Sequence, residues 1–162
     1  MRFPLSDQMN IIREACIWTA EKLAGGYDYK ETHYQSVLGH ALMKRGFVVS
    51  SEENIEYSIM DDHKRIVFGF GRLDLKVTCP IGRTWILELK CVSNLKYIEA
   101  YRAQLKRYIK HTREPVLGVL IIFNNTESVH IEKHLDIKCQ ESKGSISFGL
   151  SSDPSRQQSP EE

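Results

Sequence analysis

The chain has 162 residues, of which 41% are hydrophobic and 27% charged, as expected of one globular domain with a substantial core. Its formal net charge of +1 excludes an overall electrostatic attraction to nucleic acid, so any such attraction must come from local patches. The four cysteines form no CxxC pair, which argues against zinc or iron–sulfur sites, and no apolar run approaches the roughly 20 residues of a membrane span.

The N-terminus shows no signal-peptide pattern, so we expect an intracellular protein of the cytoplasm or nucleus, with no membrane association and with reduced thiols. Residues 6–24 predict a packing helix that Gly25 and Gly26 end, and residues 1–26 form an N-terminal unit. One side of this helix is lined by Ile12, Cys16, Thr19 and Leu23.

Residues 29–45 predict a second helix, and Glu31 falls on its otherwise apolar stripe with Tyr34 and Leu38. A buried, unpaired carboxylate is costly, so its position calls for an explanation. Asp28 and Glu31 have the spacing of a capping box at the positive end of the helix. Alternatively, Glu31 points toward a metal site as a further ligand.

Residues 47–51, 54–59 and 65–70 have the composition of strands, and residues 61–64 form a polar turn between the last two. Gly69 and Gly71 indicate a bulge, or a place where the backbone closely approaches another group.

Residues 71–77 and 85–91 alternate polar and apolar side chains with period two, as paired strands do. A hairpin centred on Ile81 places Asp74 opposite Glu88, Leu73 opposite Leu89 and Val77 opposite Trp85. One face is then apolar and the other polar. The polar face carries Arg72, Asp74, Lys76, Glu88 and Lys90.

Two carboxylates opposite one another on neighbouring strands repel, unless a cation lies between them. Asp74 and Glu88 therefore predict an oxygen-rich site for Mg²⁺ or Mn²⁺, with the Lys90 ammonium on the same face. The alternative is an ordinary solvated polar face of an antiparallel sheet.

Residues 95–110 predict a helix with an inner stripe of Tyr97, Tyr101, Leu105 and Tyr108, in which Gln104 also lies. Its outward face is basic, with Arg102, Lys106, Arg107, Lys110 and Arg113. Together with Arg72 and Lys76, this face either contacts nucleic-acid phosphates or is simply solvated.

Residues 116–123 are continuously apolar, as in a strand covered on both faces, and a helical crossover would make it parallel to its neighbour. His130 and His134 have a spacing that could ligate metal on a helix, although no third ligand accompanies them. The composition from residue 141 to 162 predicts a disordered tail after a domain of residues 27–140.

The order helix, three strands, helix, strand, with Asp74 and Glu88-Leu89-Lys90 on the middle hairpin, resembles the PD-(D/E)XK nuclease superfamily. More narrowly, it resembles the GxxExxY family. The ExxY motif falls on Glu31 and Tyr34, and Gln104 and Tyr108 fit the helix that carries a glutamine and a tyrosine. The resemblance covers roughly residues 29–124 and implies an α/β fold with an αβββαβ core, a mixed sheet flanked by helices and an extra N-terminal helix.

The resemblance implies a metal-dependent nuclease, with DNA as the favoured substrate and Mg²⁺ or Mn²⁺ as the cofactor. Asp74, Glu88, the Leu89 carbonyl and Glu31 would bind metal, and Lys90 would orient or deprotonate the attacking water. Gln104 would position water or phosphate, and Tyr34 and Tyr108 would support the site. The other class of function is a non-catalytic nucleic-acid-binding or assembly module with the same fold. The sequence is also compatible with a homodimer or with a protein partner.

Overall fold

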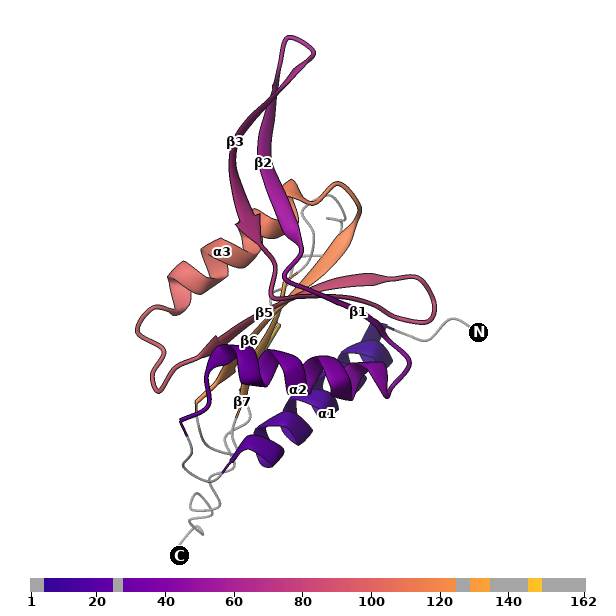
Figure 1. Cartoon of the computed structure of the whole chain (residues 1–162), viewed down its shortest axis with the longest axis vertical. Coiled ribbons are helices and arrows are strands. Elements are labelled where there is room, and N and C mark those ends of the chain that lie inside the picture. Colours follow the sequence, from indigo (N-terminus) through magenta and orange to yellow (C-terminus); the bar gives the residue numbers. More distant parts are fainter. Residues whose placement is uncertain (1–4, 25–27, 125–128, 135–145, 150–162) are drawn as a thin grey trace, which may run out of the picture.

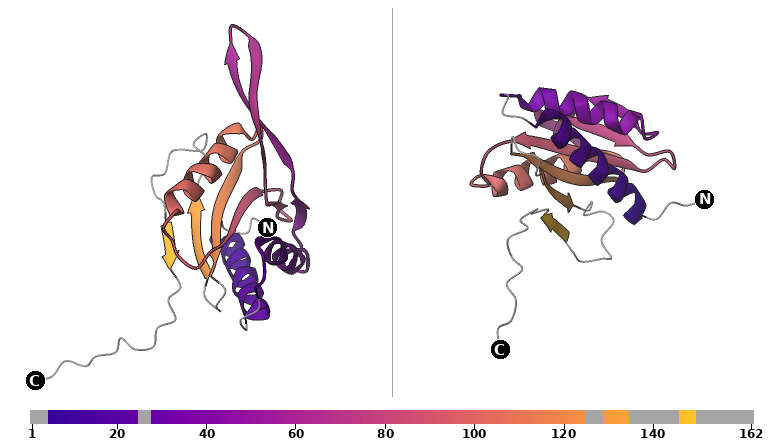
Figure 2. Two further views of the ribbon diagram at one scale, coloured as in Figure 1. Left: turned by 60° about the vertical axis from the view of Figure 1, so that its left-hand side comes forward. Right: turned by 90° about the horizontal axis from the view of Figure 1, so that it is seen from below.

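A computed structural model describes residues 5–24, 28–124, 129–134 and 146–149. A six-stranded mixed sheet with the order β1-β4-β5-β6-β7-β8 forms the body, and β2 and β3 form a separate two-stranded sheet. Helices α1 and α2 cover one face of the larger sheet and α3 covers the other (Figures 1 and 2). This mixed α/β architecture is the one that the sequence predicts.

Helices α1 (Leu5–Leu23) and α2 (Glu31–Met43) pack on each other and on one face of the sheet. The buried side of α1 includes Ile12, Cys16 and Thr19, which confirms its predicted stripe. No helix in the described part of the chain is long and apolar enough to cross a bilayer.

Strands β1 (Val48–Ser51), β4 (Leu75–Thr78) and β5 (Thr84–Cys91) are antiparallel neighbours. Val77 pairs with Trp85, which confirms the register centred on Ile81. The ladder ends earlier than predicted, because residues 71–72 belong to β3 and the chain bends before β4 begins. Leu73 therefore packs with the core under α3, not beside Leu89.

Strands β2 (Asn54–Asp61) and β3 (Lys64–Arg72) form a hairpin that extends away from the body, which we call the β-arm (Figure 1). Its tip residues Asp62 and His63 have positive φ angles of 41° and 66°, as a tight hairpin turn requires. The strand register shifts between Tyr57 and Ser58, next to Gly69, so the predicted irregularity is confirmed.

Helix α3 (Ile98–His111) connects β5 to β6 (Val116–Phe123), and the two strands run parallel. Every residue of β6 is buried, as its continuous apolar sequence predicts. The helix crosses at Gly118, where a β-carbon would come within 2.5 Å of Ile109 Cδ1. Tyr97 lies outside the predicted inner stripe, because the helix begins after it and its side chain is exposed.

Strand β7 (Val129–His134) continues the sheet, so the helical spacing of two histidine ligands does not arise. Strand β8 (Ile146–Gly149) pairs with β7 inside the stretch predicted as a disordered tail. Its alternating Ile-Ser-Phe-Gly sequence is compatible with an edge strand, although serine and glycine dominate the surrounding composition. The rest of residues 141–162 lies outside the described residues.

Candidate metal site

Asp74 lies at the bend where the chain passes from the β-arm into β4. Its side-chain Oδ2 accepts a 2.8 Å hydrogen bond from the Leu89 backbone N–H. Its carbonyl oxygen accepts bonds from the Glu52 backbone N–H at 3.2 Å and from the Gln35 side-chain amide at 3.0 Å. Asp74 is thus not a ladder partner of Glu88, as the sequence predicted, but it reaches the same point on β5 through its side chain.

Gln35 was not among the predicted site residues. It lies on the buried side of α2, and its amide is one of the two groups that hold the Asp74 carbonyl. A signal was present in the sequence, since Gln35 follows Glu31 by four residues and so lies on the same helical stripe.

Glu88 lies in the middle of β5 on the face under α3, and 0% of its surface is exposed. Its Oε1 accepts a 2.6 Å hydrogen bond from Lys90 Nζ, whereas its Oε2 has no hydrogen-bond partner among the described residues. Burial and the nearby Asp74 carboxylate raise the pKa of Glu88 to about 8. A solvated polar face is therefore excluded at this position.

Lys90 contacts two carboxylates and one aromatic ring. Its Nζ lies 2.6 Å from Glu88 and 3.7 Å from Glu31, and it stands 5.7 Å from the centre of the Tyr101 ring. Burial disfavours the ammonium, but Glu88 and Glu31 outweigh burial and raise the pKa of Lys90. These surroundings suit an ammonium that donates hydrogen bonds.

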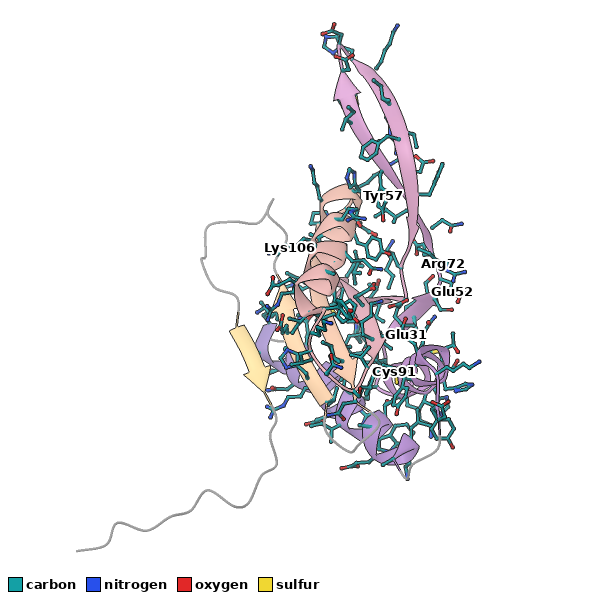
Figure 3. The ribbon with its side chains drawn as sticks, turned by 90° about the vertical axis from the view of Figure 1, so that its left-hand side faces the viewer. Glu31, Glu52, Tyr57, Arg72, Cys91 and Lys106 are labelled. Carbon is teal, nitrogen blue, oxygen red and sulfur yellow. The ribbon has the colours of Figure 1, made fainter. Side chains whose placement is uncertain are left out.

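Glu31 is the first residue of α2 and is not part of a capping box with Asp28. The helix N-cap is Lys30, whose N–H donates to His33 Nδ1 at 2.9 Å. Glu31 faces Lys90, and burial raises the pKa of its carboxyl group. Figure 3 shows Glu31 at the same end of the site as Cys91.

Of the predicted supporting residues, Tyr108 and Gln104 lie on the α3 side of the sheet, whereas Tyr34 lies in the core on the side of α1 and α2. Gln104 donates a 2.8 Å hydrogen bond to the Tyr108 hydroxyl. Burial raises the pKa of Tyr108, and the negative charges of Glu88 and Asp74 add to that effect. Tyr34 stacks on Phe123, with ring centres 4.5 Å apart.

The basic side chains that the sequence predicts to contact phosphate divide into two groups. Lys76 is paired with Glu53 at 3.1 Å and with Glu114. Arg102 donates to Glu132 at 2.7 Å and also pairs with Glu99. These two side chains are held by carboxylates, which removes them from the group available to phosphate.

Arg72, Lys106 and Arg107 remain exposed. Arg72 lies 3.7 Å from Glu52 at the base of the β-arm (Figure 3). Arg107 stands over the Tyr57 ring.

Asp74 and Glu88 fit a hard divalent cation. Glu88 is buried and Asp74 half-buried, burial raises the pKa of both carboxyl groups, and the Glu88 Oε2 lacks the partner that a buried acceptor requires. No three His, Cys, Asp or Glu side chains of the described chain are grouped as a metal cage. Mg²⁺ typically takes only one or two carboxylates and completes its shell with water and substrate phosphate, so two suffice.

A pocket of about 810 Å³ lies at the base of the β-arm, near the end of α3. Lys76, Phe70 and His111 line it, whereas Asp74 and Glu88 do not. It is therefore distinct from the carboxylate pair.

A family model described as the PD-(D/E)XK nuclease superfamily matches residues 6–134. Among solved structures, "Crystal structure of SSO0001" is similar at 17% sequence identity and a TM-score of 0.46. That similarity covers 79% of this chain and 66% of the other, so the chain spans slightly less than two thirds of that protein. No curated protein matches the chain.

Proposed function

Since the chain belongs to the PD-(D/E)XK nuclease superfamily, we propose that it is an active nuclease that hydrolyses phosphodiester bonds in nucleic acid, DNA in the first instance. The cofactor would be Mg²⁺ or Mn²⁺, held by Asp74, Glu88 and the Leu89 carbonyl. The motif of Glu31 and Tyr34 on α2 supports assignment to the GxxExxY family within the superfamily.

The observation that carries this proposal is the Glu88 carboxylate. It is fully buried, it lies beside a second carboxylate, and its Oε2 has no hydrogen-bond partner among the described residues. A buried acid in this state destabilises a protein that has no use for it. A divalent cation would neutralise the pair, lower the pKa of a bound water and stabilise the leaving oxygen.

The remaining residues have roles that follow from their contacts. Lys90 is held between Glu88 and Glu31, where its ammonium can donate to a phosphate oxygen or orient a water molecule. Glu31 keeps Lys90 in place and lies within reach of the site as a further acceptor. Gln104, oriented by Tyr108, would position water or phosphate.

The test is a cleavage screen of plasmid DNA, single-stranded DNA and RNA with Mg²⁺ or Mn²⁺, and with EDTA. Asp74→Asn and Glu88→Gln should each reduce cleavage by at least about 100-fold, a loss that the removal of an outer-shell partner can already cause. Glu21→Gln, an exposed glutamate of α1, is the matched control and should cleave like the wild type. Equal cleavage by Glu88→Gln and the wild type would reject the assigned site.

Isothermal titration with Mn²⁺ separates the two classes of function. A nuclease should bind the ion, and both substitutions should abolish the binding. A folded wild-type protein that binds no Mn²⁺ and cleaves no substrate would be a binding or assembly module that keeps the nuclease fold.

A further inference from the structure

The β-arm exposes large apolar side chains that nothing in the described structure covers. Phe70 is 70% exposed, Met60 66% and Phe68 60%. Large apolar side chains that gather on one exposed element mark a site of interaction. The chemistry around the arm indicates which partner it fits.

Aromatic rings run from the candidate metal site to the arm. The Tyr108 ring lies 6.4 Å from the Tyr57 ring, and the two are nearly parallel, with an interplanar angle of 24°. Phe68 follows at 6.2 Å from Tyr57, and His111 lies 5.2 Å from Tyr57 and 5.7 Å from Phe68. The charges of Glu88 and Asp74 act on the Tyr108 hydroxyl and raise its pKa, so this aromatic track begins near the carboxylates.

Two glycines of β3 make room for the track. A β-carbon at Gly71 would come 2.2 Å from the Tyr57 hydroxyl and 2.7 Å from Tyr108 Cε1. At Gly69 it would come 3.1 Å from the Tyr57 ring. The absence of side chains here lets Tyr57 lie against β3, on the side of the β-arm that faces α3 (Figure 3).

The helix beside the track is basic. Arg107 stands 5.7 Å from the centre of the Tyr57 ring, and Lys106 and Lys110 are exposed on the same helix. Within the described residues, no carboxylate is in ion-pair contact with any of these three cations. They are thus available to neutralise an anion.

We propose that the β-arm and the adjoining side of α3 bind an unpaired nucleic-acid strand, whose bases stack on Phe68 and Tyr57 and whose phosphates contact Arg107, Lys106 and Lys110. This inference rests on the proposed nuclease function, which it deepens by naming single-stranded nucleic acid, or a single-stranded branch, as the substrate.

Two physical arguments favour this partner. Ring faces can stack only on bases whose own faces are open, and a duplex covers them except at its ends. A second copy of this chain, packed on the same surface, would bring the three cations close to their equivalents, and like charges repel.

The test is fluorescence anisotropy with a labelled oligothymidine of about 12 nucleotides, which is within the site sizes of single-strand binding folds. Measurements in EDTA, on the full chain, keep binding separate from cleavage. Phe68→Ser should weaken binding about tenfold, and Phe68→Trp should restore it. Met60→Ser, an equally exposed apolar side chain without a ring, is the matched control and should bind like the wild type.

A blunt duplex of the same length should bind the wild type more weakly, with no effect of Phe68→Ser. Equal losses in Phe68→Ser and Met60→Ser, or equal affinity for duplex and single strand, would overturn the proposal. So would a Phe68→Ser variant that changes oligomeric state and keeps its affinity for oligothymidine, because the arm would then be a protein contact. Failure of cleavage alone would reject the nuclease and leave this binding result standing.

Discussion

Two glutamates occupy one row of the sheet and experience opposite surroundings. Glu88 on β5 and Glu132 on β7 both pair in register with Leu120 of β6, one from each side, and both are buried. Arg102 donates to both oxygens of Glu132, and His130 Nε2 lies 2.8 Å from one of them. Glu88 has one lysine and a neighbouring carboxylate.

The different surroundings shift the pKa values of the two glutamates in opposite directions. Hydrogen bonds from Arg102 lower the pKa of Glu132 to about 2, whereas burial and Asp74 raise the pKa of Glu88 to about 8. Glu132 is a satisfied ion pair that joins α3 to the sheet. Glu88 lacks a partner that a cation could supply, and this is the contrast expected between a carboxylate that binds a ligand and one that only stabilises the fold.

Removal of the Arg102 guanidinium beside Glu132 should have the largest effect on stability. Arg102→Met removes the guanidinium that pairs with both oxygens of the buried Glu132 carboxylate, and should lower the free energy of unfolding by about 3–5 kcal/mol. Urea denaturation at neutral pH measures this loss, and Lys106→Met on the exposed side of the same helix should change it by no more than about 0.5 kcal/mol. Similar values for the two variants would show that the Arg102 pair contributes nothing.

Glu88→Gln should raise the stability of the protein, in contrast to Arg102→Met. The folded-state pKa of about 8 exceeds the ordinary value of 4.5, so the folded state holds the proton more tightly than the unfolded chain. The wild type therefore loses stability as pH rises from 4.5 to 8, and Glu88→Gln removes that loss. The variant should be more stable by about 2–4 kcal/mol at pH 8.5 and unchanged at pH 4.

Urea denaturation at both pH values provides the check for Glu88. Glu21→Gln is again the control and should match the wild type throughout. A Glu88→Gln variant that is less stable than the wild type at pH 8.5 would show that the carboxylate is already satisfied in the metal-free protein.

The affinity for metal should depend on the protonation of Glu88. Below pH 8 a cation must displace the proton of Glu88, so Mn²⁺ affinity should rise about tenfold per pH unit and level off above pH 8. Titration calorimetry in two buffers of different ionisation enthalpy would detect the released proton. A Mn²⁺ affinity independent of pH between 6 and 8 would contradict the protonated state of Glu88.

The smallest effect is expected at Gln35. Gln35→Leu removes one of the two donors to the Asp74 carbonyl and should cost about 1 kcal/mol of stability. If Gln35 positions Asp74, the Mn²⁺ concentration for half-maximal cleavage should also rise, by about fivefold, and Ser36→Ala should leave it unchanged. A loss of stability with no change in this concentration would make Gln35 purely structural.

Local sequence patterns were sufficient to predict much of this fold. The period-two alternation around Ile81 predicted the pairing of Val77 with Trp85, and the apolar run of residues 116–123 predicted a strand buried on both faces. The bend at Asp74 was not predictable, because the alternation continues through it. What ends the ladder there is the contact of Asp74 with Gln35 of α2, Leu89 of β5 and Glu52 of the bend between β1 and β2.

The sequence alone determined that Glu88 and Lys90 share one face of a strand, because strand geometry is local. Only the tertiary structure decided which charges are compensated. It joined Lys76 to Glu114 and Arg102 to Glu132, and it left one oxygen of Glu88 without a donor from the described residues. The physical reason is that burial and ion pairing depend on groups that are distant in the chain, and these set the protonation state on which the chemistry depends.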